Sequence, residues 1–121
     1  MAGEATIQLA GFVHKTPELR FTNSGVAVLK LTVKVTPYNT RTQEKKEPSW
    51  YQVSVWRDAA ENAAETINEG DRVLVAGTLE MGSYEKDGVK RYVPEVTAQS
   101  IGVIPRKLET GKTVVDDGSP W

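Results

Sequence analysis

The chain has 121 residues and no cysteine, which suits one domain that folds without disulfides and excludes a thiolate metal site. No segment approaches the roughly 18 apolar residues that a membrane helix needs, and residues 1–6 lack the features of a signal peptide, so we expect neither element. The formal net charge is −1, but residues 14–57 hold eight Lys and Arg against three Glu, and for nucleic-acid binding the distribution of charge matters more than its sum.

Alternation of apolar and polar residues predicts five strands. They cover residues 5–13, 26–35, 50–57, 72–80 and 89–104. We expect Gly11 to bend the first strand and Pro94 to mark an edge or a bulge in the last. The polar stretch at 38–49 has no periodicity and predicts a long loop. The Asp87-Gly88 pair predicts the tight turn of a hairpin.

One short helix is predicted between the third and fourth strands. Asp58 is expected to be its N-cap, with Glu61 completing a capping box, and Gly70 follows its end. A narrow apolar stripe recurs at helical spacing in Ala60, Ala63, Ala64 and Ile67. Five strands with one helix between the third and fourth is the order of an OB-fold, an all-β, five-stranded barrel. An SH3-like barrel is the alternative, although it has no natural place for a full helix there.

The patterns of enzymes and metal sites do not occur in this sequence. His14 is the one histidine, and there is no HExxH motif, phosphate-binding loop or nucleophile elbow. The many carboxylates are not paired with a nucleophile in a known arrangement. We therefore expect no enzymatic activity, no cofactor and no metal ion, with His14 exposed near a strand end.

Two tryptophans share one face of the third strand. Gln52 and Ser54 lie between Trp50 and Trp56 in the alternation, and a buried face would not usually carry them there. Bases stack on flat aromatic rings and need polar partners between them, and each stacked base is worth roughly 1–3 kcal/mol. The pattern therefore favours a binding face exposed to solvent. The alternative is that Trp56 turns inward against the helix and Trp50 anchors the long loop.

The other aromatic residues divide into two groups. Phe12 and Phe21 lie in or near the first strand and are expected in the core. Tyr38 begins the polar loop and Tyr84 stands in the hairpin, and neither has apolar neighbours to pack with. Basic residues near the aromatics could meet phosphates, although loop lysines can also be merely solvated. They are Lys34, Arg41, Lys45, Lys46, Arg57, Lys86, Lys90 and Arg91.

Several segments together resemble the bacterial single-stranded DNA-binding proteins, over about residues 4–104. The most specific are Pro-Glu-Leu-Arg-Phe-Thr at 17–22 and the run from Trp50 to Arg57 that continues into 59–65. Ser-Val-Trp-Arg before the helix is most similar to actinobacterial members. The resemblance implies an OB-fold domain at 1–104 that binds single-stranded DNA in replication, repair and recombination. It also implies four stacking positions, which here are Tyr38, Trp50, Trp56 and Tyr84.

The resemblance further implies a cytoplasmic, nucleoid-associated homotetramer. The narrow helix stripe and the strands with two apolar faces agree with an oligomer, for which we expect contacts at Ile7 and Leu9 and at the face of residues 72–79. Residues 105–121 are expected to form a short flexible tail. Its end resembles the acidic, aromatic-ended tip through which this family recruits genome-maintenance proteins, in Asp116, Asp117, Pro120 and Trp121.

Two other functions remain open for an OB-fold with this sequence. One is a protein-interaction module that no longer binds DNA, against which Trp50, Trp56 and Tyr84 argue. The other is an RNA-binding domain of the cold-shock type, which usually has more compact aromatic motifs on the second and third strands. Titration with single-stranded DNA, RNA and duplex DNA distinguishes all three.

Overall fold

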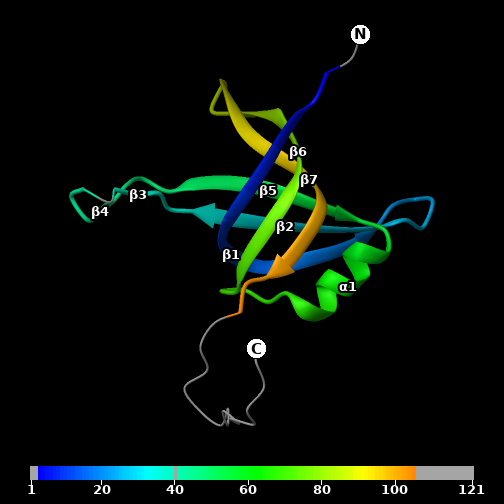
Figure 1. Ribbon diagram of the computed structural model, residues 1–121. Coiled ribbons are helices and arrows are strands. Elements are labelled where there is room, and N and C mark those ends of the chain that lie inside the picture. The colour runs from blue at the N-terminus through cyan, green and yellow to red at the C-terminus, as the bar shows by residue number, and fades with distance from the viewer. Residues whose placement is uncertain (1–2, 40, 106–121) are drawn as a thin grey trace, which may run out of the picture.

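The computed structural model describes residues 3–39 and 41–105, without the side chains of Tyr38 and Asn39. Five strands close into a barrel in the order β1-β2-β5-β7-β6 (Figure 1). These strands are β1 (Ala5–Phe21), β2 (Ala27–Val35), β5 (Ser49–Trp56), β6 (Arg72–Lys86) and β7 (Val89–Val103). The helix α1 (Asp58–Thr66) lies between β5 and β6, the third and fourth barrel strands, so the predicted OB-fold is confirmed.

The stretch expected to be a long loop contains a small ladder of its own. Strands β3 (Tyr38–Asn39) and β4 (Glu44–Lys45) pair antiparallel, with Tyr38 opposite Lys45. The N–H of Lys46 donates to the carbonyl of Pro37 at 2.9 Å. Two-residue strands are too short to show a period of two, which explains why the sequence did not predict them.

The long strand β1 changes partners along its length. Residues 5–12 pair with β6, and residues from Phe12 onward pair with β2. The register shifts between His14 and Glu18, and Lys15 there has φ 66°. This bulge interrupts the alternation, so the predicted strand ended at residue 13 although the real one continues to Phe21. A Cβ on Gly11 would lie 2.5 Å from the carbonyl oxygen of Lys34, so Gly11 permits a close approach of β1 to β2.

The barrel core consists of the inward residues of each strand and one face of the helix. Fully buried side chains include Leu29, Val33, Val53, Val55, Val73, Val75 and Val96. The predicted helix stripe is confirmed, because Ala60, Ala63 and Ile67 are buried against this core. Since α1 covers only one end of the barrel, the outer face of the sheet stays available.

The predicted capping box at the start of α1 is wrong. Arg57 is the N-cap, with φ 64° and no side-chain cap hydrogen bond, and Asp58 is already the first helical residue. The N–H of Arg57 donates to the carbonyl of Ala27 at 2.8 Å. This bond holds Arg57 to the first residue of β2, so the chain turns sharply at Arg57 and the helix begins at the next residue.

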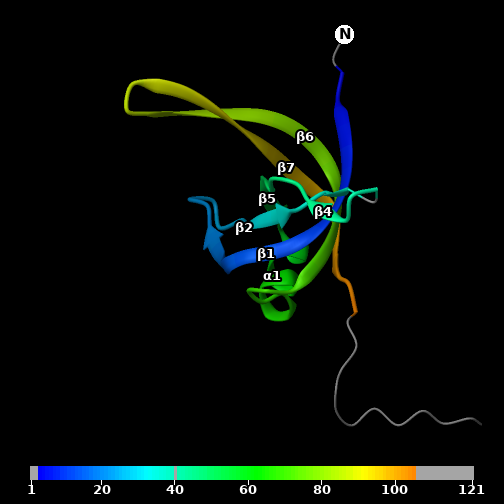
Figure 2. The same ribbon diagram turned by 90° about the vertical axis from the view of Figure 1, so that its left-hand side faces the viewer.

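Strands β6 and β7 extend beyond the barrel as a hairpin. Both turn residues, Asp87 and Gly88, have positive φ (55° and 76°), as a tight two-residue hairpin turn requires. The predicted turn is therefore confirmed, but β6 continues to Lys86 rather than ending at residue 80. Figure 2 shows this hairpin projecting from the barrel, away from the helix.

Two predictions about β1 are wrong. Phe12 and Phe21 are 54% and 59% exposed rather than in the core. Leu9 is buried in the core and the half-buried Ile7 packs against it, so they do not form an exposed edge, because β1 has β6 and β2 as neighbours in a closed barrel. Ile7, Leu9 and Val13 point inward, so the alternation of a strand directs Phe12 outward.

Candidate nucleic-acid interface

Strand β5 presents two indoles on the outer face of the barrel. Trp50 and Trp56 are 39% and 42% exposed, and Gln52 and Ser54 lie between them on the same face. Val53 and Val55 point the other way and are buried in the core. The predicted orientation of both tryptophans is therefore confirmed, and the inward alternative for Trp56 is wrong.

Trp50 is held by side chains from two other strands. The ring of His14 meets it edge-on, with 4.8 Å between ring centroids and an interplanar angle of 73°. The Nζ of Lys34, directly opposite Trp50 in the β2–β5 ladder, lies 5.5 Å from the indole centroid. Trp50 is thus an exposed aromatic surface with a cation against it, a combination that suits a base and its phosphate.

Trp56 lies at the other end of the same face. It is opposite Val28 in the β2–β5 ladder, and Arg20 is opposite Val28 on the β1 side. Val28 points outward with these two residues but is buried, so the side chains around it cover it. Arg20, Val28 and Trp56 therefore form one row across three neighbouring strands on the outer face.

The projecting hairpin separates its basic residues between two faces. Tyr84 of β6 is directly opposite Arg91 of β7, and the next pair on the same face is Lys86 opposite Val89. The side chains of both pairs therefore share one face of the hairpin. Lys90 is opposite Glu85 on the other face, where its Nζ lies 5.5 Å from the centroid of Tyr92. The structure thus brings Tyr84, Lys86 and Arg91 together and separates Lys90 from them.

The Tyr84 face of the hairpin continues the outer face of the barrel. Strands β5 and β7 are parallel, with Gln52 paired to Glu95. Side chains two residues apart share a face, so Arg91 points to the same side as Glu95 and Gln52. Trp50, Trp56 and Tyr84 therefore lie on one side of a continuous sheet.

The other predicted contacts lie around this surface. Arg41, Lys45 and Lys46 are exposed in and beside the β3–β4 ladder, and Arg57 is exposed at the start of α1. Tyr38 belongs to β3, but its side chain lies outside the described residues, as do Asp116, Asp117, Pro120 and Trp121. The predicted roles of Tyr38 and of these four residues at the end of the chain therefore stay predictions.

Sequence reasoning missed two residues of this surface, His14 and Phe12. His14 is exposed as expected, but it lies within β1 just before the bulge rather than near a strand end. Nothing in a single strand indicates its contact with Trp50. Phe12 was assigned to the core because it is large and apolar. The alternation of Ile7, Leu9 and Val13 is a signal that could have placed Phe12 outside.

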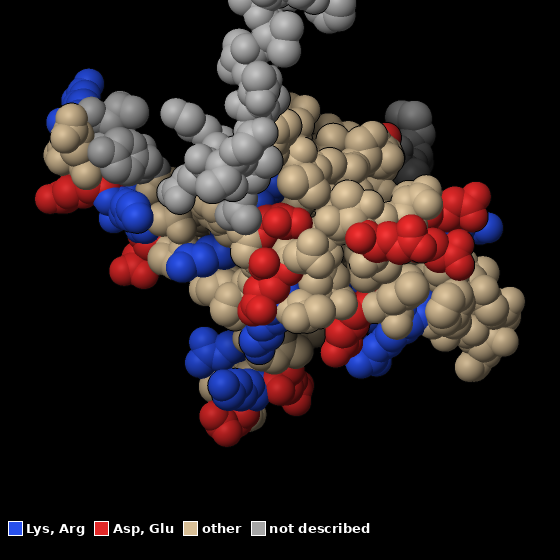
Figure 3. All heavy atoms as spheres, turned by 90° about the horizontal axis from the view of Figure 1, so that it is seen from below, with Lys and Arg blue, Asp and Glu red and all other residues tan. Residues whose placement is uncertain are grey.

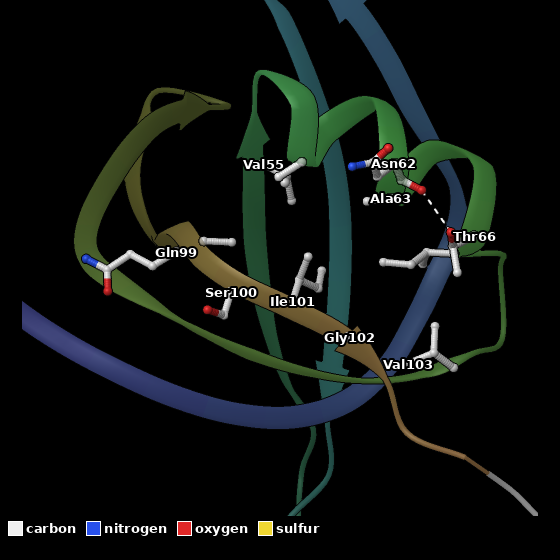
Figure 4. Close-up of a pocket in the computed structure, with 12 residues that line it drawn as sticks. Val55, Asn62, Ala63, Thr66, Gln99, Ser100, Ile101, Gly102 and Val103 are labelled. Carbon is white, nitrogen blue, oxygen red and sulfur yellow. Dashed lines mark hydrogen bonds between the residues drawn. The ribbon is translucent and has the colours of Figure 1, made fainter.

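A separate hollow lies between α1 and β7. It has a volume of about 400 Å³ and is lined largely by apolar side chains such as Val55, Ala63 and Ile101 (Figure 4). Thr66 donates its Oγ1–H to the carbonyl of Asn62 at its rim, at 2.9 Å. Acidic and basic side chains are both present on the face of the molecule seen from below (Figure 3), but α1 itself carries Asp58, Glu61 and Glu65 and no Lys or Arg. The negative charge of α1 is unfavourable for phosphates, so we do not include this hollow in the candidate nucleic-acid interface.

Within residues 3–39 and 41–105, no cluster of three or more His, Asp or Glu side chains could hold a metal ion. In the same part of the chain, no helix is long and apolar enough to cross a membrane.

Comparison with known proteins decides the family. The family model of the single-strand binding protein family matches residues 5–104. The chain belongs to this family. A single-stranded DNA-binding protein of Paenarthrobacter aurescens is 46% identical over 110 residues, covering 84% of this chain and 63% of the relative. Single-stranded DNA-binding protein 2 of Streptomyces coelicolor is 47% identical over 123 residues, covering 98% of this chain and 61% of the relative.

A solved structure gives the same result for the fold. The crystal structure of a small single-stranded DNA-binding protein from Streptomyces coelicolor matches with a TM-score of 0.71 and 25% identity, over 85% of this chain and 96% of that one. These organisms confirm the resemblance to actinobacterial members of the single-strand binding protein family. The relatives are named as DNA-binding proteins, in agreement with the expectation that the chain is not an enzyme. The chain spans somewhat less than two thirds of the length of the two relatives.

Proposed function

We propose that this chain binds single-stranded DNA on the outer face of its barrel without strong sequence preference. One observation carries the proposal: Trp50 and Trp56 are exposed on the same face of β5, with the polar side chains of Gln52 and Ser54 between them. Every base has a flat face, so stacking on indoles tolerates any sequence, and it requires bases that are free of a duplex. The names of the relatives agree with this ligand.

The charges around the tryptophans favour the same ligand. Lys30 and Lys34 point outward from β2, beside Ser54 and Trp50 of β5. Arg91 and Lys86 share the hairpin face of Tyr84. Cations on both sides of a row of aromatic rings can neutralise the phosphates while the rings hold the bases.

These positions define a path for the strand. It runs along β5 from Trp56 to Trp50 and continues onto the hairpin at Tyr84, all on one side of the sheet. We propose that the path also reaches Tyr38 and the basic residues of the β3–β4 ladder, beyond the Trp50 end of β5. Ser49 precedes Trp50 and pairs with Val35, which lies shortly before β3 in the chain, so the ladder begins near this end of β5.

Binding to matched ligands tests the proposed function. A fluorescently labelled dT oligonucleotide is titrated with the full chain, and fluorescence anisotropy is recorded. Unlabelled single-stranded DNA should displace it well, and duplex DNA of the same length poorly. RNA that competes better than DNA would indicate an RNA-binding domain, and the absence of saturable binding would indicate an interaction module.

We also propose that the chain acts as a homotetramer. The outer face of the β1–β6–β7 part of the barrel carries Leu74, which is exposed, together with Ala10 and Ala76. A hollow of about 460 Å³ lies on this face, lined by Leu74, Ile104 and Pro105 among others. An apolar sheet surface of this kind marks an interaction site, and a second copy of the chain is the occupant we propose.

For the end of the chain we propose recruitment of other proteins in replication, repair and recombination, within the cytoplasm and at the nucleoid. Asp116 and Asp117 repel phosphates, and Trp121 is a large aromatic anchor for a pocket on another protein. Removal of residues 116–121 should leave DNA affinity unchanged, or slightly higher at low salt, and should abolish capture of helicase, exonuclease or recombination-mediator proteins. Capture of the same proteins by the truncated chain would contradict the role.

A further inference from the structure

Phe12 occupies a junction in the barrel that the proposed path along β5 does not use. It is the residue at which β1 changes partners, so it is paired with Arg72 of β6 on one side and Lys34 of β2 on the other. Its side chain is 54% exposed on the outer face. A large exposed phenyl ring therefore has a basic residue directly opposite it on each neighbouring strand.

This junction is continuous with the Trp50 site. Lys34 is opposite Phe12 in the β1–β2 ladder and opposite Trp50 in the β2–β5 ladder. Residues that are directly opposite point to the same face, so Phe12, Lys34 and Trp50 form one row across three strands. Neighbouring strands are about 4.8 Å apart, which places Phe12 roughly 10 Å from Trp50 along this row.

His14 strengthens the connection between the two aromatic positions. It lies two residues after Phe12 on the same strand, and its ring contacts Trp50 edge-on at 4.8 Å. The indole of Trp50 therefore reaches across the outer face of β2 towards β1. A nucleotide stacked on Trp50 would have its neighbour close to the phenyl ring of Phe12.

The chemistry of the row selects one class of partner. A phenyl ring has no polar atom, so exposure to water gains it nothing, and an aromatic surface between two cations fits a ligand with flat rings and negative charge. Single-stranded DNA offers both at every nucleotide. We propose that Phe12 is a further base-stacking position, with Lys34 and Arg72 meeting the adjacent phosphates. The inference rests on the proposed function and extends its path from β5 across β2 to β1.

Four chains test this position by titration of a labelled dT oligonucleotide: wild type, Phe12→Leu, Phe12→Tyr and Phe21→Leu. Phe12→Leu keeps an apolar side chain but removes the ring, and its affinity should fall by about 5- to 150-fold, the range known for loss of one base–aromatic stack. Phe12→Tyr keeps the ring and should bind within about twofold of wild type. Phe21 is the matched control, because it lies on the same strand, is 59% exposed, and pairs with Ala27 rather than with a basic residue.

Two further measurements distinguish base stacking at Phe12 from a role in folding or in subunit contact. The thermal unfolding temperature of Phe12→Leu should match that of wild type, because the Phe12 side chain packs little. If Phe12→Leu is less stable than wild type, Phe12→Tyr serves as the folded control. Sedimentation should show the same assembly state for wild type and Phe12→Leu. A shift towards monomer would make Phe12 a subunit contact and overturn the inference.

The titrations also separate this inference from the proposed function. If Phe12→Leu binds DNA with unchanged affinity while Trp50→Ala binds weakly, the inference about Phe12 is overturned but the proposed function still holds. No binding by wild type would instead reject the proposed function.

Discussion

The imidazole of His14 and the indole of Trp50 meet edge-on across strand β2, with 4.8 Å between their centroids. His14 belongs to β1 and is paired with Thr32, whereas Trp50 belongs to β5 and is paired with Lys34. The contact thus ties together strands that are not hydrogen-bonded neighbours. It restricts the indole, and a ring that is already ordered loses less conformational entropy when a base stacks on it.

Replacement of His14 by Ala should therefore weaken single-stranded DNA binding through Trp50. We expect a loss of about 0.5–1.5 kcal/mol, the range for an aromatic pair. In a Trp50→Ala background the same change should have almost no effect, because the ring that His14 positions is gone. Anisotropy titrations of the two single variants and the double variant measure this coupling. Losses that simply add would show that His14 acts independently of Trp50.

The two faces of the hairpin give a test with matched charges. Arg91→Glu should lower affinity for single-stranded DNA of any sequence, because Arg91 shares the face of Tyr84. Lys90→Glu changes a cation to an anion at the adjacent position but on the opposite face, beside Tyr92, so its effect should be much smaller. Each lost phosphate contact reduces the slope of log affinity against log salt by about 0.7. Equal losses from both variants would place the strand elsewhere on the hairpin.

Gly77 tests the packing that closes the barrel. A Cβ at this position would overlap the carbonyl of Thr97 on β7, where the β6–β7 register shifts. Gly77→Ala should lower the free energy of unfolding by about 1–3 kcal/mol, as overpacking does. Gly102→Ala is the control, because a Cβ there would meet nothing within 4 Å. Urea denaturation measures the free energy of unfolding of both variants. Equal values for Gly77→Ala and Gly102→Ala would show that β7 can move away from Gly77 at little cost.

Leu74 tests the proposed subunit contact. A glutamate at this exposed position on the outer face of β6 would place a charge in an apolar interface. Leu74→Glu should shift the assembly towards monomer at micromolar concentration in sedimentation experiments, with little change in the fold of each barrel. A wild-type chain that sediments as a 13.3 kDa monomer would reject the homotetramer.

The fold followed from the sequence because alternation is a local signal. It placed Val53 and Val55 inside and Trp50 and Trp56 outside, and the Asp87-Gly88 turn required no knowledge of other strands. The exchange of partners at Phe12 is different, since it exists only when β6 and β2 meet β1. The size and apolarity of Phe12 outweighed its place in the alternation, which explains its assignment to the core.

The start of the helix and the contacts of the site also depend on distant residues. Asp58 and Glu61 have the spacing of a capping box, but the bond from Arg57 to Ala27 fixes the chain one residue earlier. Likewise, the sequence predicted Lys34 near the aromatic residues without predicting that it lies against Trp50, or that Lys90 faces away from Tyr84. Cross-strand register decides both, and no local pattern contains it.

Intrinsic fluorescence during a dT titration tests most directly whether bases stack on Trp50 and Trp56. The chain has three tryptophans, so a Trp121→Phe variant leaves these two as its reporters. We predict saturable quenching as dT is added. Trp50→Ala and Trp56→Ala should each weaken binding by roughly 1–3 kcal/mol with thermal unfolding unchanged. Binding that is evident from anisotropy but leaves the fluorescence unchanged, with both alanine variants at wild-type affinity, would contradict the account.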